Sequence, residues 1–138
     1  MRVVLDTNVL VSGLLNPYGP PGRIADLVLT EHLRPLFDDR IMAEYRDVLA
    51  RPKFGFRTAD LHDFLRQLEA VGEAVIPTPL AVDLPDQDDL PFLEVAAAGL
   101  ARALVTGNVR HFTPRRGTHQ VKVVSPNEFL KKLKREAP

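Results

Sequence analysis

Four polar residues that lie far apart in the chain are candidates for one chemical site: Asp6, Glu44, Asp89 and Asn108. Three of them are carboxylic acids, and the fourth carries an amide oxygen. Two carboxylates about 4 Å apart repel each other by about 4 kcal/mol at an effective dielectric constant of about 20. A cluster of such groups must take up protons, separate or hold a cation. Oxygen ligands without His or Cys favour Mg²⁺ or Mn²⁺.

Each candidate also has a purely structural interpretation. Asp6 or Thr7 could cap the helix that follows, Glu44 could be a solvated helix residue, and Asn108 could cap a turn. The aspartates within residues 86–89 would suit the positive end of a helix dipole. Capping requires only one accepting oxygen, however, and does not explain acids from three separate segments. The combination therefore favours a site.

The elements that would position these residues can be read from the apolar pattern. Short apolar runs predict strands, and runs with helical spacing separate them. The expected strands are residues 2–5, 33–37, 74–76, 103–106 and 121–124. The expected helices are residues 8–15, 24–29, 41–49, 59–68, 89–98 and 126–133. We expect Asp38 or Asp39 to cap the third of them, Thr58 the fourth and Ser125 the last. This alternation predicts an α/β fold with a central parallel sheet of four or five strands, covered on both faces.

The same pattern places the four candidates near one edge of the sheet. Asp6 ends the first strand, Asn108 follows the fourth, and Asp89 opens the helix that leads to the fourth. Glu44 lies one turn into the helix after the second strand. Ligands of open α/β sheets bind beyond the carboxyl ends of the strands. The chemistry expected there is attack of metal-activated water on a phosphodiester.

Composition limits the number of domains, the kinds of metal site and the location that this protein can have. The chain has 138 residues, no Cys and no net charge, which predicts one domain over residues 1–138 without disulfides or thiolate metal sites. No secretory or membrane-spanning pattern is visible, and we expect a cytoplasmic protein. Charge is sorted along the chain: residues 60–99 carry nine acidic groups and one basic group, whereas residues 100–138 carry nine basic and two acidic groups.

Three segments resemble a known family. They are VVLDTNVLVSGLL (residues 3–15), AEYRDVLARPKF (43–54) and PDQDDLPFLEVAAAGLARALVTGN (85–108). In order and spacing they are similar to the PIN-domain nucleases. More narrowly, they resemble the bacterial and archaeal toxins of toxin–antitoxin systems related to the VapC toxins. The resemblance covers nearly the whole chain.

The resemblance implies a three-layer α/β/α sandwich and a catalytic set made of Asp6, Glu44, Asp89 and Asn108. It implies that the three acids bind Mg²⁺ or Mn²⁺ and that the protein cleaves single-stranded RNA. Where the family carries a fourth Asp, this chain has Asn108. An amide can still offer a carbonyl oxygen or orient a water, so the departure leaves open whether one metal or two are bound.

Further residues are expected around this set. Asn8 would brace the turn behind Asp6, Thr106 matches a Ser or Thr that the family places near the site, and Asp86 would support the site from its loop. Arg110 and His111 could bind phosphates or could belong to a solvated basic loop, as could arginines 115 and 116. Glu94 is expected to be solvated.

The resemblance also implies partners: single-stranded RNA, a cognate antitoxin protein and a second copy of the chain in a homodimer. The alternative is a catalytically weak PIN fold that acts as a binding or scaffold protein, which Asn108 would favour. A phosphatase of the haloacid dehalogenase type would need a second Asp at position 8, where the chain has Asn8. A nucleotide-binding domain would need a glycine-rich phosphate loop, and none is present.

Overall fold

Strands and helices alternate in the structure as the sequence predicts. The computed structural model describes residues 1–136, and the predicted domain end at residue 138 lies outside them. The strands are β1 (Arg2–Leu5), β2 (Arg34–Phe37), β3 (Glu73–Ala74), β4 (Ala103–Val105) and β5 (Val123–Val124). The α-helices are α1 (Thr7–Leu15), α2 (Pro20–Leu29), α3 (Asp39–Leu49), α4 (Thr58–Val71), α5 (Leu90–Ala98) and α6 (Pro126–Glu136). The short 3-10 helices are η1 (Pro52–Phe54), η2 (Gln87–Asp89) and η3 (Val109–Phe112).

The five strands form one parallel sheet in the order β3-β2-β1-β4-β5. Strand β1 lies at its centre, and Val3, Val4 and Leu5 are completely buried. A central parallel strand is covered on both faces, which explains why β1 is apolar without alternation. The prediction of an α/β fold with a parallel sheet covered on both faces is therefore confirmed.

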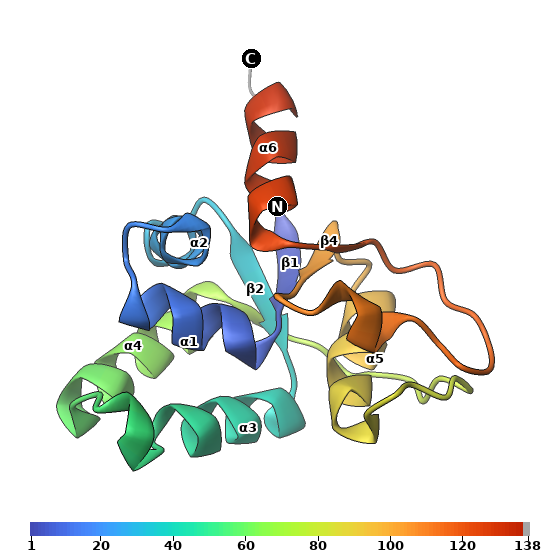
Figure 1. Cartoon of the computed structure of the whole chain (residues 1–138), viewed down its shortest axis with the longest axis horizontal. Coiled ribbons are helices and arrows are strands. Elements are labelled where there is room, and N and C mark those ends of the chain that lie inside the picture. Colours follow the sequence, from blue (N-terminus) through green and yellow to red (C-terminus); the bar gives the residue numbers. More distant parts are fainter. Residues whose placement is uncertain (137–138) are drawn as a thin grey trace.

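The helices form layers on both sides of this sheet (Figure 1). Helices α1, α2 and α4 lie on one side, and α5 packs on the other side against β1, β2 and β4. Helix α3 crosses the carboxyl end of the sheet, whereas α6 rises from its amino end. No helix within residues 1–136 combines the length and the apolar composition needed to cross a membrane.

Helix α2 begins earlier than predicted. The prolines and glycines of residues 16–22 predict a loop, but α2 already begins at Pro20, with proline in its first turn. A proline fits there because the first helical N–H groups have no partner within the helix. Gly22 is needed for the packing, because a Cβ on it would lie 2.2 Å from the carbonyl oxygen of Pro17.

The predicted helix caps are partly confirmed. Asp38 caps α3 by accepting a hydrogen bond from the amide of Ile41 at 3.0 Å. Ser125 accepts a bond from the amide of Glu128 at 3.2 Å, at the start of α6. The prediction that Thr58 caps α4 is wrong, because Thr58 is the first helical residue and the capping position is Arg57, without a side-chain bond.

Candidate active site

The sheet register positions the first acid. Leu5 pairs with Val105, so the next residues, Asp6 and Thr106, lie side by side at the carboxyl end of the sheet. The Thr106 hydroxyl donates to Oδ2 of Asp6 at 2.7 Å, and both side chains are buried. Asp6 occupies the capping position of α1 but makes no capping bond with its side chain. Simple capping therefore does not explain this buried carboxylate.

Asn8 ties the two strand ends together. Its Nδ2 donates to Oδ2 of Asp6 at 3.3 Å, and its Oδ1 accepts from the amide of Gly107 at 3.0 Å. The amide of Asn108 donates to the Thr106 hydroxyl at 3.0 Å. The hydrogen bonds from Thr106 and Asn8 both end on Oδ2 of Asp6, so neither of them occupies Oδ1. The Asn108 side chain is exposed at the same edge.

Helix α3 brings the second acid to the same edge. The Thr7 hydroxyl donates to Oε2 of Glu44. The next residue in the helix, Tyr45, is completely buried, and its hydroxyl donates to the carbonyl oxygen of Leu5 at 2.5 Å. These two bonds attach α3 to the residues on either side of Asp6. The interpretation of Glu44 as an ordinary solvated helix residue is therefore wrong.

The third acid comes from the loop before α5. Asp86 turns this loop by accepting a bond from the amide of Asp88 at 2.9 Å, and the turn ends at Asp89. Oδ2 of Asp89 is buried and has no hydrogen-bond partner within residues 1–136. Nδ1 of His111 lies 3.6 Å away, which is beyond hydrogen-bond distance.

All three acids have raised pKa values, and the charge of Asp6 contributes to the rise at the other two. Burial raises the pKa of Asp6, and the hydrogen bond from Thr106 opposes that rise. Burial, opposed by the Thr7 bond, raises the pKa of Glu44, and the charges of Asp6 and Asp86 add to the rise. Burial and the charges of Asp6, Asp86 and Glu44 raise the pKa of Asp89 to about 6, although His111 opposes this. The three carboxylates therefore converge on one region.

This region has the chemistry of a divalent-cation site. Its donors are oxygens, the acids disfavour one another's charge, and Oδ2 of Asp89 is buried without a partner. Such features suit Mg²⁺ or Mn²⁺. Within residues 1–136, however, no three His, Asp or Glu side chains are already grouped closely enough to hold an ion. Binding would have to draw the carboxylates closer together.

A pH-dependent stability follows from Asp89. Its pKa rises from 3.8 to about 6 on folding, so the folded state binds its proton more tightly than the unfolded state. In chelator, the free energy of unfolding should therefore fall as pH rises from about 4 to 6, relative to Asp89→Asn. We expect a difference of about 1 kcal/mol at pH 7, after allowance for solvent screening, and only a small fraction of it at pH 4, close to the unfolded pKa. Urea unfolding at both pH values measures it, and parallel curves would contradict the raised pKa.

Glu94 connects α5, which follows Asp89, to α3, which carries Glu44. The expectation that it is solvated is wrong, because only 5% of it is exposed. Its Oε1 lies 2.8 Å from Nη1 of Arg40 in α3, and its Oε2 accepts from the amide of Leu80 at 2.9 Å. Arg40 also pairs with Asp38 at 2.8 Å. Glu94 thus holds α5, α3 and the loop after β3 in one arrangement.

Replacing Glu94 by Gln should lower the free energy of unfolding by about 2 kcal/mol. Breaking a fully buried pair costs about 3–5 kcal/mol, but the Arg40 side chain is 45% exposed, which reduces the effect. The matched control is Glu69→Gln, which removes a surface pair with Arg46 at 3.9 Å and should cost less than about 1 kcal/mol. Urea unfolding compares the two, and equal losses would show that the Glu94 pair is no stronger than a surface pair.

The basic residues after Asn108 surround an open pocket. Residues 107–111 line a volume of about 430 Å³, and His111 brings it next to Asp89. Arg110 is exposed there and makes no ion pair within residues 1–136. The loop that carries Arg115 and Arg116 instead pairs through its backbone with Asp83, at 2.7 and 2.9 Å.

Three supporting contacts around the site were not predicted from the sequence. The bonds of Thr7 to Glu44 and of Tyr45 to Leu5 depend on how α3 is rotated, which the spacing of residues does not reveal. Glu94 did carry a signal, because residues 90–98 are apolar all round apart from this one acid. A helix that is apolar on every side is buried, so its only charged residue must be buried as well.

Comparison with known proteins places the chain in a family. A sequence model described as PIN domain matches residues 2–110, a range that includes Asp6, Glu44, Asp89 and Asn108. An uncharacterized protein of Methanocaldococcus jannaschii is 28% identical over 145 residues, which cover 98% of this chain and 93% of that protein. No solved structure gives a significant match. The chain therefore belongs to the PIN domain family, whose fold is that of a nuclease.

Proposed function

We propose that this protein is a metal-dependent endoribonuclease that cleaves single-stranded RNA in the cytoplasm, as the toxin of a toxin–antitoxin pair. The observation that carries the proposal is the convergence of Asp6, Glu44 and Asp89 at the carboxyl end of the sheet, where the charge of Asp6 helps to raise the pKa values of the other two. Ionised carboxylates that lie close together are unfavourable unless a cation binds between them, so their convergence indicates a cation site. The toxin role, the antitoxin and the homodimer rest on sequence resemblance to such toxins.

In the proposed reaction, different residues bind the metal ion and orient its ligands. Asp6, Glu44 and Asp89 would hold Mg²⁺ or Mn²⁺, which when bound lowers the pKa of water and shields negative charge on the phosphoryl group. Thr106 and Asn8 orient the carboxylate of Asp6 through their bonds to its Oδ2.

Two further contacts position Glu44 and its helix, and two exposed residues face the substrate. Thr7 orients Glu44, and Tyr45 fixes the distance between α3 and the end of β1. Arg110, exposed on the adjoining pocket, would attract the phosphates of the RNA strand. Asn108 can orient a water through its amide.

The test is cleavage of an end-labelled single-stranded RNA by the pure protein. We expect products with Mg²⁺ or Mn²⁺ and none with excess chelator, and little cleavage of the same sequence as a duplex. In parallel, Mn²⁺ at 100 times its dissociation constant should raise the free energy of unfolding by about 2.7 kcal/mol. Cleavage that persists in chelator would refute the metal-dependent mechanism.

The alternative, a catalytically weak binding or scaffold protein, gives a different result in the same test. It predicts RNA binding without products under any divalent ion. Asn108, in place of a fourth Asp, is the observation that favours it. Growth arrest on induced expression tests the toxin role separately, because a housekeeping nuclease would cleave RNA in vitro without arresting growth.

A further inference from the structure

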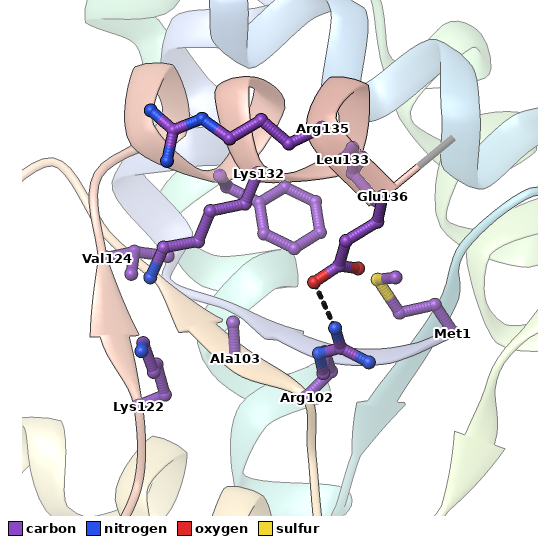
Figure 2. A pocket seen from close by; sticks show the side chains of 10 residues that line it. Met1, Arg102, Ala103, Lys122, Val124, Lys132, Leu133, Arg135 and Glu136 are labelled. Carbon is purple, nitrogen blue, oxygen red and sulfur yellow. Dashed lines mark hydrogen bonds and ion pairs between the residues drawn. The ribbon is translucent and has the colours of Figure 1, made fainter. Parts of the chain in front are cut away.

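A second pocket lies at the opposite end of the sheet from the acids, below α6. It has a volume of about 300 Å³. Ala103 of β4 and Val124 of β5 form part of its floor, and Phe129 and Leu133 line it from α6. Figure 2 shows charged side chains on both sides of Ala103. The pocket therefore combines an apolar interior with a charged rim.

Two lysines on this rim lie close together. Figure 2 shows the ammonium groups of Lys122 and Lys132 pointing toward each other on the β5 side of the pocket. The adjacent Lys122 lowers the pKa of Lys132, although the charge of Glu128 opposes this. Within residues 1–136, neither lysine has a carboxylate within 4.0 Å. Two cations that face each other without a carboxylate in contact attract an anion that can bridge them.

The other charged groups that line the pocket are not placed to bind an anion inside it. Arg102 forms an ion pair with Glu136 on the far side of Ala103. The guanidinium of Arg135 points away from the pocket. The lysine pair is thus the place on the rim where an anion gains most.

The pocket's two halves together define a ligand class. A small inorganic anion would use the lysines but leave the apolar interior empty. An uncharged ring would use the interior but leave the lysines unpaired. A volume of about 300 Å³ is at the lower limit of small-molecule sites and suits one heterocyclic base in the interior, with an attached sugar and phosphate that extend to the charged rim.

We propose that this pocket binds a nucleoside monophosphate, free or at the end of an RNA strand. The phosphate bridges Lys122 and Lys132, and the base lies on Val124, Phe129 and Leu133. No glycine-rich loop is needed, because the side chains supply the positive charge. The inference is independent of the proposed function, since a protein that cleaves nothing could still bind a nucleotide here.

The test is calorimetric titration of the full chain with AMP at low salt and in excess EDTA. Without metal ions, the acids at the other end of the sheet repel phosphate and do not contribute. The double variant Lys122→Gln/Lys132→Gln should bind AMP at least about tenfold more weakly. The matched control is Lys131→Gln/Lys134→Gln, which removes the same charge from exposed positions of α6 and should change affinity less than about twofold.

Equal losses in the two double variants would overturn the proposal, because they would indicate unspecific attraction of charge. Inorganic phosphate that binds as tightly as AMP would also overturn it, because the base would then contribute nothing. Tighter binding of a 5′-phosphorylated trinucleotide than of AMP would identify the ligand as an RNA end, and the reverse would identify a free nucleotide. Circular-dichroism melting confirms that each variant is folded.

Discussion

Replacing Asp6 by Asn should reduce RNA cleavage at least about a hundredfold while leaving the protein at least as stable in chelator. The substitution keeps the size of the side chain and an oxygen that can accept from Thr106, but it removes the charge that would hold a cation. Loss of a residue that only supports a metal ligand typically costs about 10–100-fold, and loss of a ligand costs more. Burial raises the pKa of Asp6, so the neutral amide also relieves an unfavourable buried charge.

The measurement combines single-turnover cleavage in Mn²⁺ with urea unfolding in EDTA. Lost cleavage together with unchanged or higher stability separates a chemical role from a structural one. Asp63→Asn is the matched control, because Asp63 is an exposed residue of α4 and its charge change is the same. Cleavage by the Asp6 variant at the rate of the unaltered protein would assign the reaction to another site or to a contaminating nuclease.

Much of the fold was predictable because its signals are local. The buried run of β1, the cap at Asp38 and the cap at Ser125 are properties of short segments. The convergence of Asp6 and Thr106 followed from topology, because parallel strands end at one edge. The early start of α2 was not predicted, because a run of two prolines and a glycine suggests a loop unless the first helical turn tolerates it.

The side-chain contacts of the site were less predictable from the sequence. The spacing of the sequence places Glu44 one turn into a helix but does not fix the rotation of that helix, and rotation decides whether Glu44 meets Thr7 or solvent. Glu94 was expected at the surface because it is a charged residue. The neighbours of Glu94 are apolar, and they bury it against Arg40. Tertiary packing determines whether such residues are buried and which partners they have. A single sequence indicates this packing only indirectly.

Changing Asn108 to Asp should strengthen Mn²⁺ binding about tenfold and raise cleavage at limiting metal. Asn108 follows Gly107 beyond β4, and its amide is bonded to the hydroxyl of Thr106, which in turn holds Asp6. A carboxylate at this position adds a fourth negative charge near the ion. A gain of about 1.4 kcal/mol, which corresponds to tenfold in affinity, is modest for one such charge at a partly exposed site.

The same variant should be less stable than the unaltered protein when metal is absent. A fourth charge would raise the pKa values of Asp6 and Asp89 further, and at neutral pH ionised acids that repel one another lower the free energy of unfolding. Stability therefore changes in opposite directions in EDTA and in Mn²⁺, an outcome that a change in packing would not produce. Asn127→Asp, on an exposed position of α6, controls for added charge alone. Unchanged Mn²⁺ affinity in the Asn108 variant would mean that its side chain does not reach the ion. It would also remove Asn108 as the reason to regard this fold as a weak catalyst.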